Sequence, residues 1–125
     1  MTNPLMKKML SEMVETYLEE SEDKKYIDDN AKYIEKEVEN ELGRYFKINK
    51  PLKQNSSKNM FTLFLATKDG REKYDVHVKY KKKGLRIMAD KITIKQGSNT
   101  ISDERVDGLE LDDTSDIANI ISQLM

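Results

Sequence analysis

The spacing of the apolar residues changes along this chain, and that change constrains the fold more than any other feature. Before about residue 46 the apolar side chains recur every three or four positions, which is the spacing of an amphipathic helix. From Met60 they alternate with polar side chains, which is typical of a strand buried on one face. Helices that precede antiparallel strands predict an α+β domain. The length of 125 residues suits a single domain, 1–125.

Residues 1–46 are predicted to form an acidic helical part with two helices. The first begins at Pro4, because proline at the first helical position lacks only an N–H that would be unpaired there. The acidic run 19–23 interrupts the apolar stripe and contains capping residues, so a second helix is expected after it, with its apolar face running from Ile27 to Leu42. Gly43 is predicted to take the left-handed conformation that often ends a helix.

Residues 47–59, which contain Pro51 and several Asn and Ser residues, are predicted to be a linker. Residues 60–96 then form a basic β-meander. The Asp69-Gly70 pair is a strong hairpin signal, because both residues tolerate a positive φ. Closing the first hairpin there sets Leu65 opposite Tyr74 and brings the apolar side chains of both strands to one face.

A second hairpin turn is predicted at Lys83-Gly84, which would set Tyr80 opposite Ile87. After Ala89 the apolar positions change from odd to even numbers. One extra residue near Asp90-Lys91 would restore them to the same face, so a β-bulge is predicted there.

Residues 97–125 are predicted to form an acidic loop with a short C-terminal helix. A further short strand can lie within residues 100–111, and Asp113 or Thr114 caps the helix. The expected architecture therefore has two N-terminal helices packed on one face of an antiparallel sheet of three to four strands, together with the short C-terminal helix.

Charge is divided unevenly between these parts, although the net charge of the chain is only −1. Residues 1–46 contain 7 basic and 12 acidic side chains, whereas residues 47–95 contain 14 basic and 4 acidic ones. Residues 96–125 contain 1 basic and 7 acidic side chains. An acidic–basic–acidic order of this kind favours a binding role for the basic part.

The candidate site is the basic second hairpin together with the apolar and aromatic spots on the non-core face of its strands. Its residues are Lys79, Lys81, Lys82, Lys83, Arg86, Phe64 and His77. Cations that contact phosphates beside rings that stack on bases are typical of nucleic-acid platforms. Two structural alternatives stay open: a solvated turn that protects a sheet edge from aggregation, or a second core layer in which the C-terminal helix covers Met60, Phe64 and Met88.

Catalysis is not expected. The predicted register places Thr62, His77 and Asp90 in one row, but a polar row on a solvated sheet face explains them without a reaction. The acidic tail fails the calcium-loop pattern, since Arg105 and Thr114 stand where oxygen ligands are required. The chain also has no Cys and no glycine-rich phosphate loop. The expected protein is therefore non-enzymatic, with no cofactor and no metal.

Two binding functions remain open at this stage. In the first, the basic hairpin acts on nucleic acid or on a complex that handles it. In the second, the acidic helices dock on a basic partner protein, and the chain is an inhibitor, an immunity-type protein or a regulatory protein. The Met-rich first helix leaves a monomer or a homodimer open. No run is apolar enough for a membrane span or a signal peptide, so a cytoplasmic location is expected.

Overall fold

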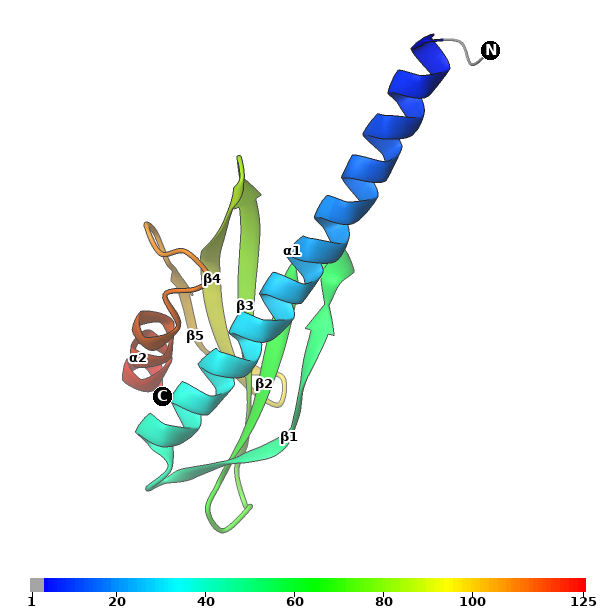
Figure 1. Ribbon diagram of the computed structural model, residues 1–125. Coiled ribbons are helices and arrows are strands. Elements are labelled where there is room, and N and C mark those ends of the chain that lie inside the picture. Colours follow the sequence, from blue (N-terminus) through cyan, green and yellow to red (C-terminus); the bar gives the residue numbers. More distant parts are fainter. Residues whose placement is uncertain (1–3) are drawn as a thin grey trace.

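A computed structural model describes the backbone of residues 4–125 and the side chains of residues 22–125. It confirms the α+β class: helices lie against a five-stranded antiparallel sheet whose strand order is β1-β2-β3-β4-β5 (Figure 1). The elements are α1 (Pro4–Leu42), β1 (Phe46–Asn55), the 3-10 turn η1 (Ser56–Lys58), β2 (Met60–Thr67), β3 (Lys73–Lys83), β4 (Arg86–Gln96), β5 (Asn99–Arg105) and α2 (Thr114–Leu124).

The N-terminal part is one helix, and the prediction of two was wrong. α1 continues through the acidic run 19–23 as a helix of 39 residues. The run contains neither Gly nor Pro, and Glu is a good helix former, so an interrupted apolar stripe does not end a helix. The helix extends beyond the end of the sheet (Figure 1). The stripe predicted over residues 5–18 lies outside the described side chains.

Gly43 follows the helix as expected, but its φ is not positive. A Cβ atom at this position would lie 2.6 Å from the carbonyl oxygen of Glu39, so the glycine permits a close approach of the backbone.

The predicted linker 47–59 is instead mostly β1, an edge strand paired with β2, so the sheet has five strands and the predicted three to four was wrong. Proline is tolerated in an edge strand, where no neighbouring strand needs its N–H, and the pairing of β1 shifts on both sides of Lys50 close to Pro51. The apolar residues Ile48 and Leu52 pack against the core. The prediction failed because bulges break the period of two and because Lys and Asn occupy the other positions.

The first hairpin has the predicted register, with Leu65 opposite Tyr74. In the second hairpin the prediction was wrong by one residue in the turn: Lys83 pairs with Arg86, so Tyr80 lies opposite Ala89 and not opposite Ile87. Because Lys83 pairs with Arg86, Gly84 is the first of two loop residues. Its φ is +65°, and two-residue hairpin turns favour glycine at this position because glycine tolerates a positive φ.

The predicted β-bulge is confirmed. Lys79 pairs with Lys91 whereas Tyr80 pairs with Ala89, so Asp90 is the extra residue in β4. Because of this bulge, Ile92 and Ile94 return to the same face as Ala89 and Ile87, and all four are buried.

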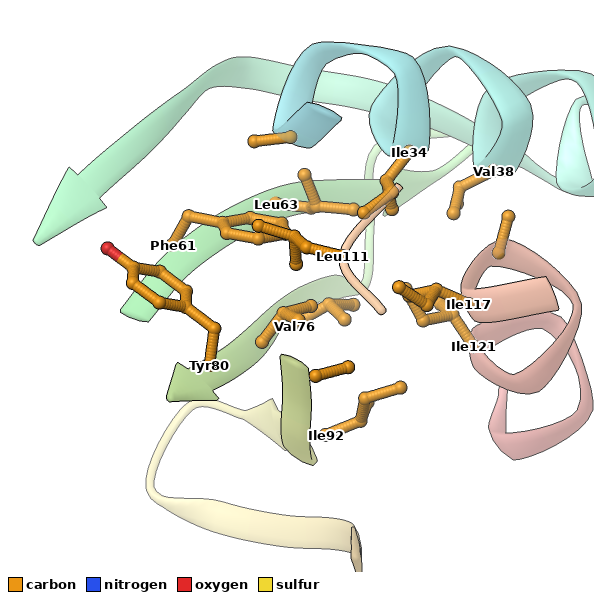
Figure 2. Packing of buried hydrophobic residues seen from close by; sticks show 14 of the residues in the cluster. Ile34, Val38, Phe61, Leu63, Val76, Tyr80, Ile92, Leu111, Ile117 and Ile121 are labelled. Atoms are coloured by element: carbon orange, nitrogen blue, oxygen red, sulfur yellow. The ribbon is translucent and has the colours of Figure 1, made fainter. Parts of the chain in front are cut away.

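Both helices cover the same face of the sheet. The short strand and the C-terminal helix were predicted correctly, and α2 begins after Asp113. Its buried residues Ile117 and Ile121 join Ile34 and Val38 of α1 in one core with the sheet (Figure 2). Within the described residues no helix lies on the other face, so the alternative in which the C-terminal helix covers Met60, Phe64 and Met88 was wrong.

Candidate functional site

The sheet face opposite the helices carries 11 of the 20 Lys and Arg side chains of residues 22–125, and we call it the open face. Directly opposed residues in an antiparallel pair share a face, so the register assigns each side chain. The open-face bases are Lys47, Lys50, Lys53, Lys73, Lys79, Lys81, Lys83, Arg86, Lys91, Lys95 and Arg105. The open-face acids are Asp75, Asp90, Asp103 and Glu110. Eleven basic side chains against four acidic ones make this face strongly cationic.

The β4–β5 side of the open face is largely neutralised. Lys91 pairs with Asp103 of β5 at 3.0 Å, and the same carboxylate accepts a hydrogen bond of 2.6 Å from Thr93. Together these contacts hold the pKa of Asp103 below its usual value, with the Thr93 hydroxyl as the largest cause. The acidic residues after β4 therefore flank the open face and do not cover it.

The tip of the second hairpin is also partly neutralised. Lys81 forms a salt bridge of 3.2 Å with Asp90, and Arg86 forms one of 3.2 Å with Glu110. The basic side chain of each pair is more than half exposed, so the pairs add little to stability, but they lower the net positive charge at the tip.

Seven open-face lysines form no salt bridge with the part of the chain whose side chains are described: Lys47, Lys50, Lys53, Lys73, Lys79, Lys83 and Lys95. Most of them lie on β1 and β3, on either side of β2. The cationic centre thus lies over β1, β2 and β3 and not at the hairpin tip.

Sequence reasoning missed the three lysines of β1, because residues 47–59 were interpreted as a linker. The available signal was the alternation of Phe46 and Ile48 with Lys47, which already has the period of a strand.

The structure brings six of the seven predicted site residues to the open face and separates the seventh. Lys82 lies opposite Ile87 and points to the helix side, where its Nζ is 2.8 Å from a carboxylate oxygen of Asp23. Successive residues of a strand point to opposite faces, so Lys81 and Lys83 cannot share a surface with Lys82.

Phe64 lies near the centre of the open face. Its ring is half-buried, and the Nζ atom of Lys50 lies over it at 5.3 Å from the ring centroid. A cation in this position is attracted by the ring, although the contact is weak where water reaches it. Phe64 is therefore a partly exposed aromatic ring with a flexible cation over it.

His77 lies beside Thr62, as predicted, and its Nδ1 is 2.8 Å from the threonine hydroxyl oxygen. On β4, His77 faces Thr93 and not the predicted neighbour Asp90. This prediction was wrong because the turn of the second hairpin lies one residue later than predicted, which shifts the pairing of β3 with β4. Desolvation by burial holds the pKa of His77 below its usual value, partly opposed by the charge of Asp75. The nearby carboxylate of Asp103 binds Thr93 and Lys91, so the row does not have the hydroxyl–imidazole–carboxylate order of a catalytic triad.

A cavity of about 420 Å³ opens on the helix side, between α1, the end of β1 and the β3–β4 hairpin. Gln54 contributes a buried amide nitrogen with no hydrogen-bond partner, and Tyr80 closes the side next to Phe61, on which its ring is stacked. Two of its charged groups, Asp23 and Lys82, already pair with each other. The sheet separates this cavity from the open-face lysines.

Within residues 22–125 no three His, Asp or Glu side chains gather in a way that could hold a metal ion. In the same part of the chain, no helix is both long and apolar enough to cross a membrane. The chain matches no protein-family model, no curated protein and no solved structure.

Proposed function

We propose that this protein is a non-enzymatic nucleic-acid-binding module that contacts phosphates with the open face of its sheet. The observation that carries the proposal is the set of seven lysines on a helix-free face that form no salt bridge with the described side chains. Lysines in a solvated row can each release a condensed counterion when they meet a phosphate, and this release drives binding of any sequence.

The division of charge across the molecule supports the same proposal. The described part of α1, residues 22–42, contains eight acidic and four basic side chains, so the helix side is acidic while the open face is basic. A molecule with this polarity is attracted to a polyanion by one face and repelled at the other, which orients the encounter. We propose the cytoplasm as its location.

The test is a fluorescence-anisotropy titration with a labelled 20-nucleotide DNA and the corresponding duplex, between 50 and 300 mM salt. Binding is expected to weaken steeply with salt. The triple variant K50E/K53E/K79E should bind at least about tenfold more weakly and show a shallower salt slope, by roughly 0.7 per lost phosphate contact on a single strand.

The matched control is K25E/K32E/K36E, which changes the net charge by the same amount on exposed positions of α1. It should retain most of the affinity. If the two triple variants weaken binding equally, only the net charge matters and the open face is not the site. If the wild-type protein binds neither probe at 50 mM salt, the proposed function is wrong.

A second candidate function is docking of the acidic helix side on a basic partner protein, as an inhibitor or regulatory subunit. The acidic excess of α1 and its extension beyond the sheet favour this candidate (Figure 1). The two functions separate on charge reversal: E37K/E41K on α1 should abolish capture of such a partner, whereas nucleic-acid binding should persist or increase.

A further inference from the structure

We infer that the open face binds single-stranded nucleic acid in preference to duplex, with one base stacked on Phe64 in place of Lys50. This inference rests on the proposed function and adds the class of nucleic acid to it. Three observations support it: the ring and its cation, the adjacent imidazole, and the width of the sheet.

A base can take the place of the Lys50 ammonium on the Phe64 ring. The lysine ammonium lies over the ring at 5.3 Å, and its flexible chain can move away at little cost. A base that takes its place stacks on the ring, while the displaced ammonium remains within reach of the phosphate of the same nucleotide. Base–aromatic stacking is tolerant of sequence, because every base has a π-face.

His77 supplies a polar group next to this ring. Phe64 lies opposite Asp75 and Thr62 lies opposite His77, so Phe64 and His77 are diagonal neighbours on β2 and β3. The Cα atoms of such a pair are typically about 7–8 Å apart, within reach of a base. The Nδ1 atom meets Thr62, and Nε2 has no partner within the described part of the chain, so it can bond a base edge.

The width of the open face argues against a duplex. Five strands at a spacing of about 4.8 Å span about 19 Å, whereas the major groove is about 12 Å wide and admits only a helix or a two-stranded ribbon. Both helices lie on the other face (Figure 1). The β3–β4 tip is narrow enough, but two of its three open-face basic residues, Lys81 and Arg86, are paired with Asp90 and Glu110, which leaves Lys83 alone. A duplex therefore meets the open lysines only along its backbone.

The chain contains no Trp, which allows a direct test. In Phe64→Trp, the new indole is the only one in the protein, and stacking of a base should quench its fluorescence. The probes are a 15-nucleotide oligothymidylate (dT15), a 15-base-pair duplex, and inorganic polyphosphate, which presents phosphates without bases. We expect strong quenching with dT15 and little with polyphosphate, although both bind the lysines.

Affinities give a second readout. Wild-type protein should bind dT15 at least about tenfold more tightly than the duplex at 100 mM salt. Phe64→Leu should weaken dT15 binding at least about fivefold, the lower end of the loss expected for one stacked base, and change duplex binding less than twofold. Phe64→Tyr keeps the ring and should restore the affinity. Thermal unfolding of each variant checks that the fold is intact.

The outcomes separate this inference from the proposed function. Equal affinity for dT15 and duplex, or equal quenching by dT15 and polyphosphate, would overturn the inference and leave a phosphate-binding face. Failure to bind any of the three probes would overturn the proposed function itself.

Discussion

The two faces of the sheet follow the same alternation but use their side chains differently, and β2 shows the contrast within four residues. Phe61 is fully buried and its ring stacks with Tyr80 at a centroid distance of 6.3 Å. Phe64, on the other face, is half-buried, and the ammonium of Lys50 lies over its ring. The residue type is the same, so the difference comes from what covers the face: two helices on one side, and side chains alone on the other.

The same contrast holds for charge. On the helix side, Lys82 and Asp23 form a pair between elements that are distant in the sequence. On the open face, the pairs lie toward β5 and the hairpin tip. The three lysines of β1, together with Lys73, Lys79 and Lys83 of β3, form no salt bridge with the described side chains. The net charge of −1 is therefore the sum of an acidic helix side and a basic open face. Four predictions test this comparison.

The largest difference is expected in stability. Phe61→Ala removes a fully buried ring and should lower the free energy of unfolding by about 3–5 kcal/mol, because it leaves a cavity beneath α1. Phe64→Ala should cost about 1 kcal/mol, since water already reaches the ring. Urea unfolding measures both. Equal losses would mean that the open face is covered in solution.

The next largest effect is expected on nucleic-acid affinity, from a substitution that extends the cationic centre toward β5. Asp103→Asn removes the carboxylate that pairs with Lys91 and releases the ammonium. Affinity for a 20-nucleotide DNA should rise by about two- to fivefold, and the salt slope should steepen by roughly 0.7 for one additional phosphate contact. Anisotropy titrations at two salt concentrations measure this. Glu104→Gln, which removes the same charge from the neighbouring position of β5, is the control and should have less effect. An unchanged affinity in Asp103→Asn would exclude Lys91 from the interface.

The carboxylate of Glu35, on the helix side, has a smaller and pH-dependent effect on the stability of the fold. Burial between α1 and β1 raises the pKa of Glu35 above its ordinary value of 4.5, although its carboxylate accepts a hydrogen bond from the backbone of Leu52. A raised pKa means that the folded state disfavours the charged form, so this group lowers stability as the pH rises above 4.5. Glu35→Gln should therefore be more stable than wild type at pH 7 and similar to it at pH 3. Urea unfolding at both pH values is the measurement, and an equal difference at both would contradict the assignment.

The smallest effect is expected at Lys82. Lys82→Ala should change nucleic-acid affinity less than twofold, because its side chain lies on the helix side. Lys79→Ala, on the open face of the same strand, should weaken binding more, and anisotropy titration compares the two. A larger loss of affinity in Lys82→Ala than in Lys79→Ala would place the interface on the helix side of the sheet and contradict the proposed function.

Much of the sheet was predictable from local rules. Asp69-Gly70 determined the register of the first hairpin, and the change from odd to even apolar positions located the bulge at Asp90. Both follow from the period of two, which any strand with one buried face must obey. The second turn was placed one residue too early, because the positive φ belongs to Gly84 as the first loop residue.

Two predictions failed for a common reason: β1 was not predicted as a strand, and α1 was predicted as two helices. β1 is an edge strand whose bulges and proline obscure its period, and α1 tolerates a charged run because good helix formers occupy it. In both segments a local signal suggested irregular structure, whereas pairing with β2 or continuation of the helix was more favourable.

The sequence by itself determined that the chain is an α+β domain, that its apolar side chains line one face of a meander, and that its middle is basic. Local hydrophobic spacing and turn residues are sufficient for these conclusions. Only the tertiary structure decided which lysines belong together. It placed both helices on the apolar face, brought the lysines of β1 to the same face as those of β3, and put Lys82 on the opposite face. The physical reason is that a surface is assembled by strand pairing and by the choice of the face that the helices bury, which no short stretch of sequence contains.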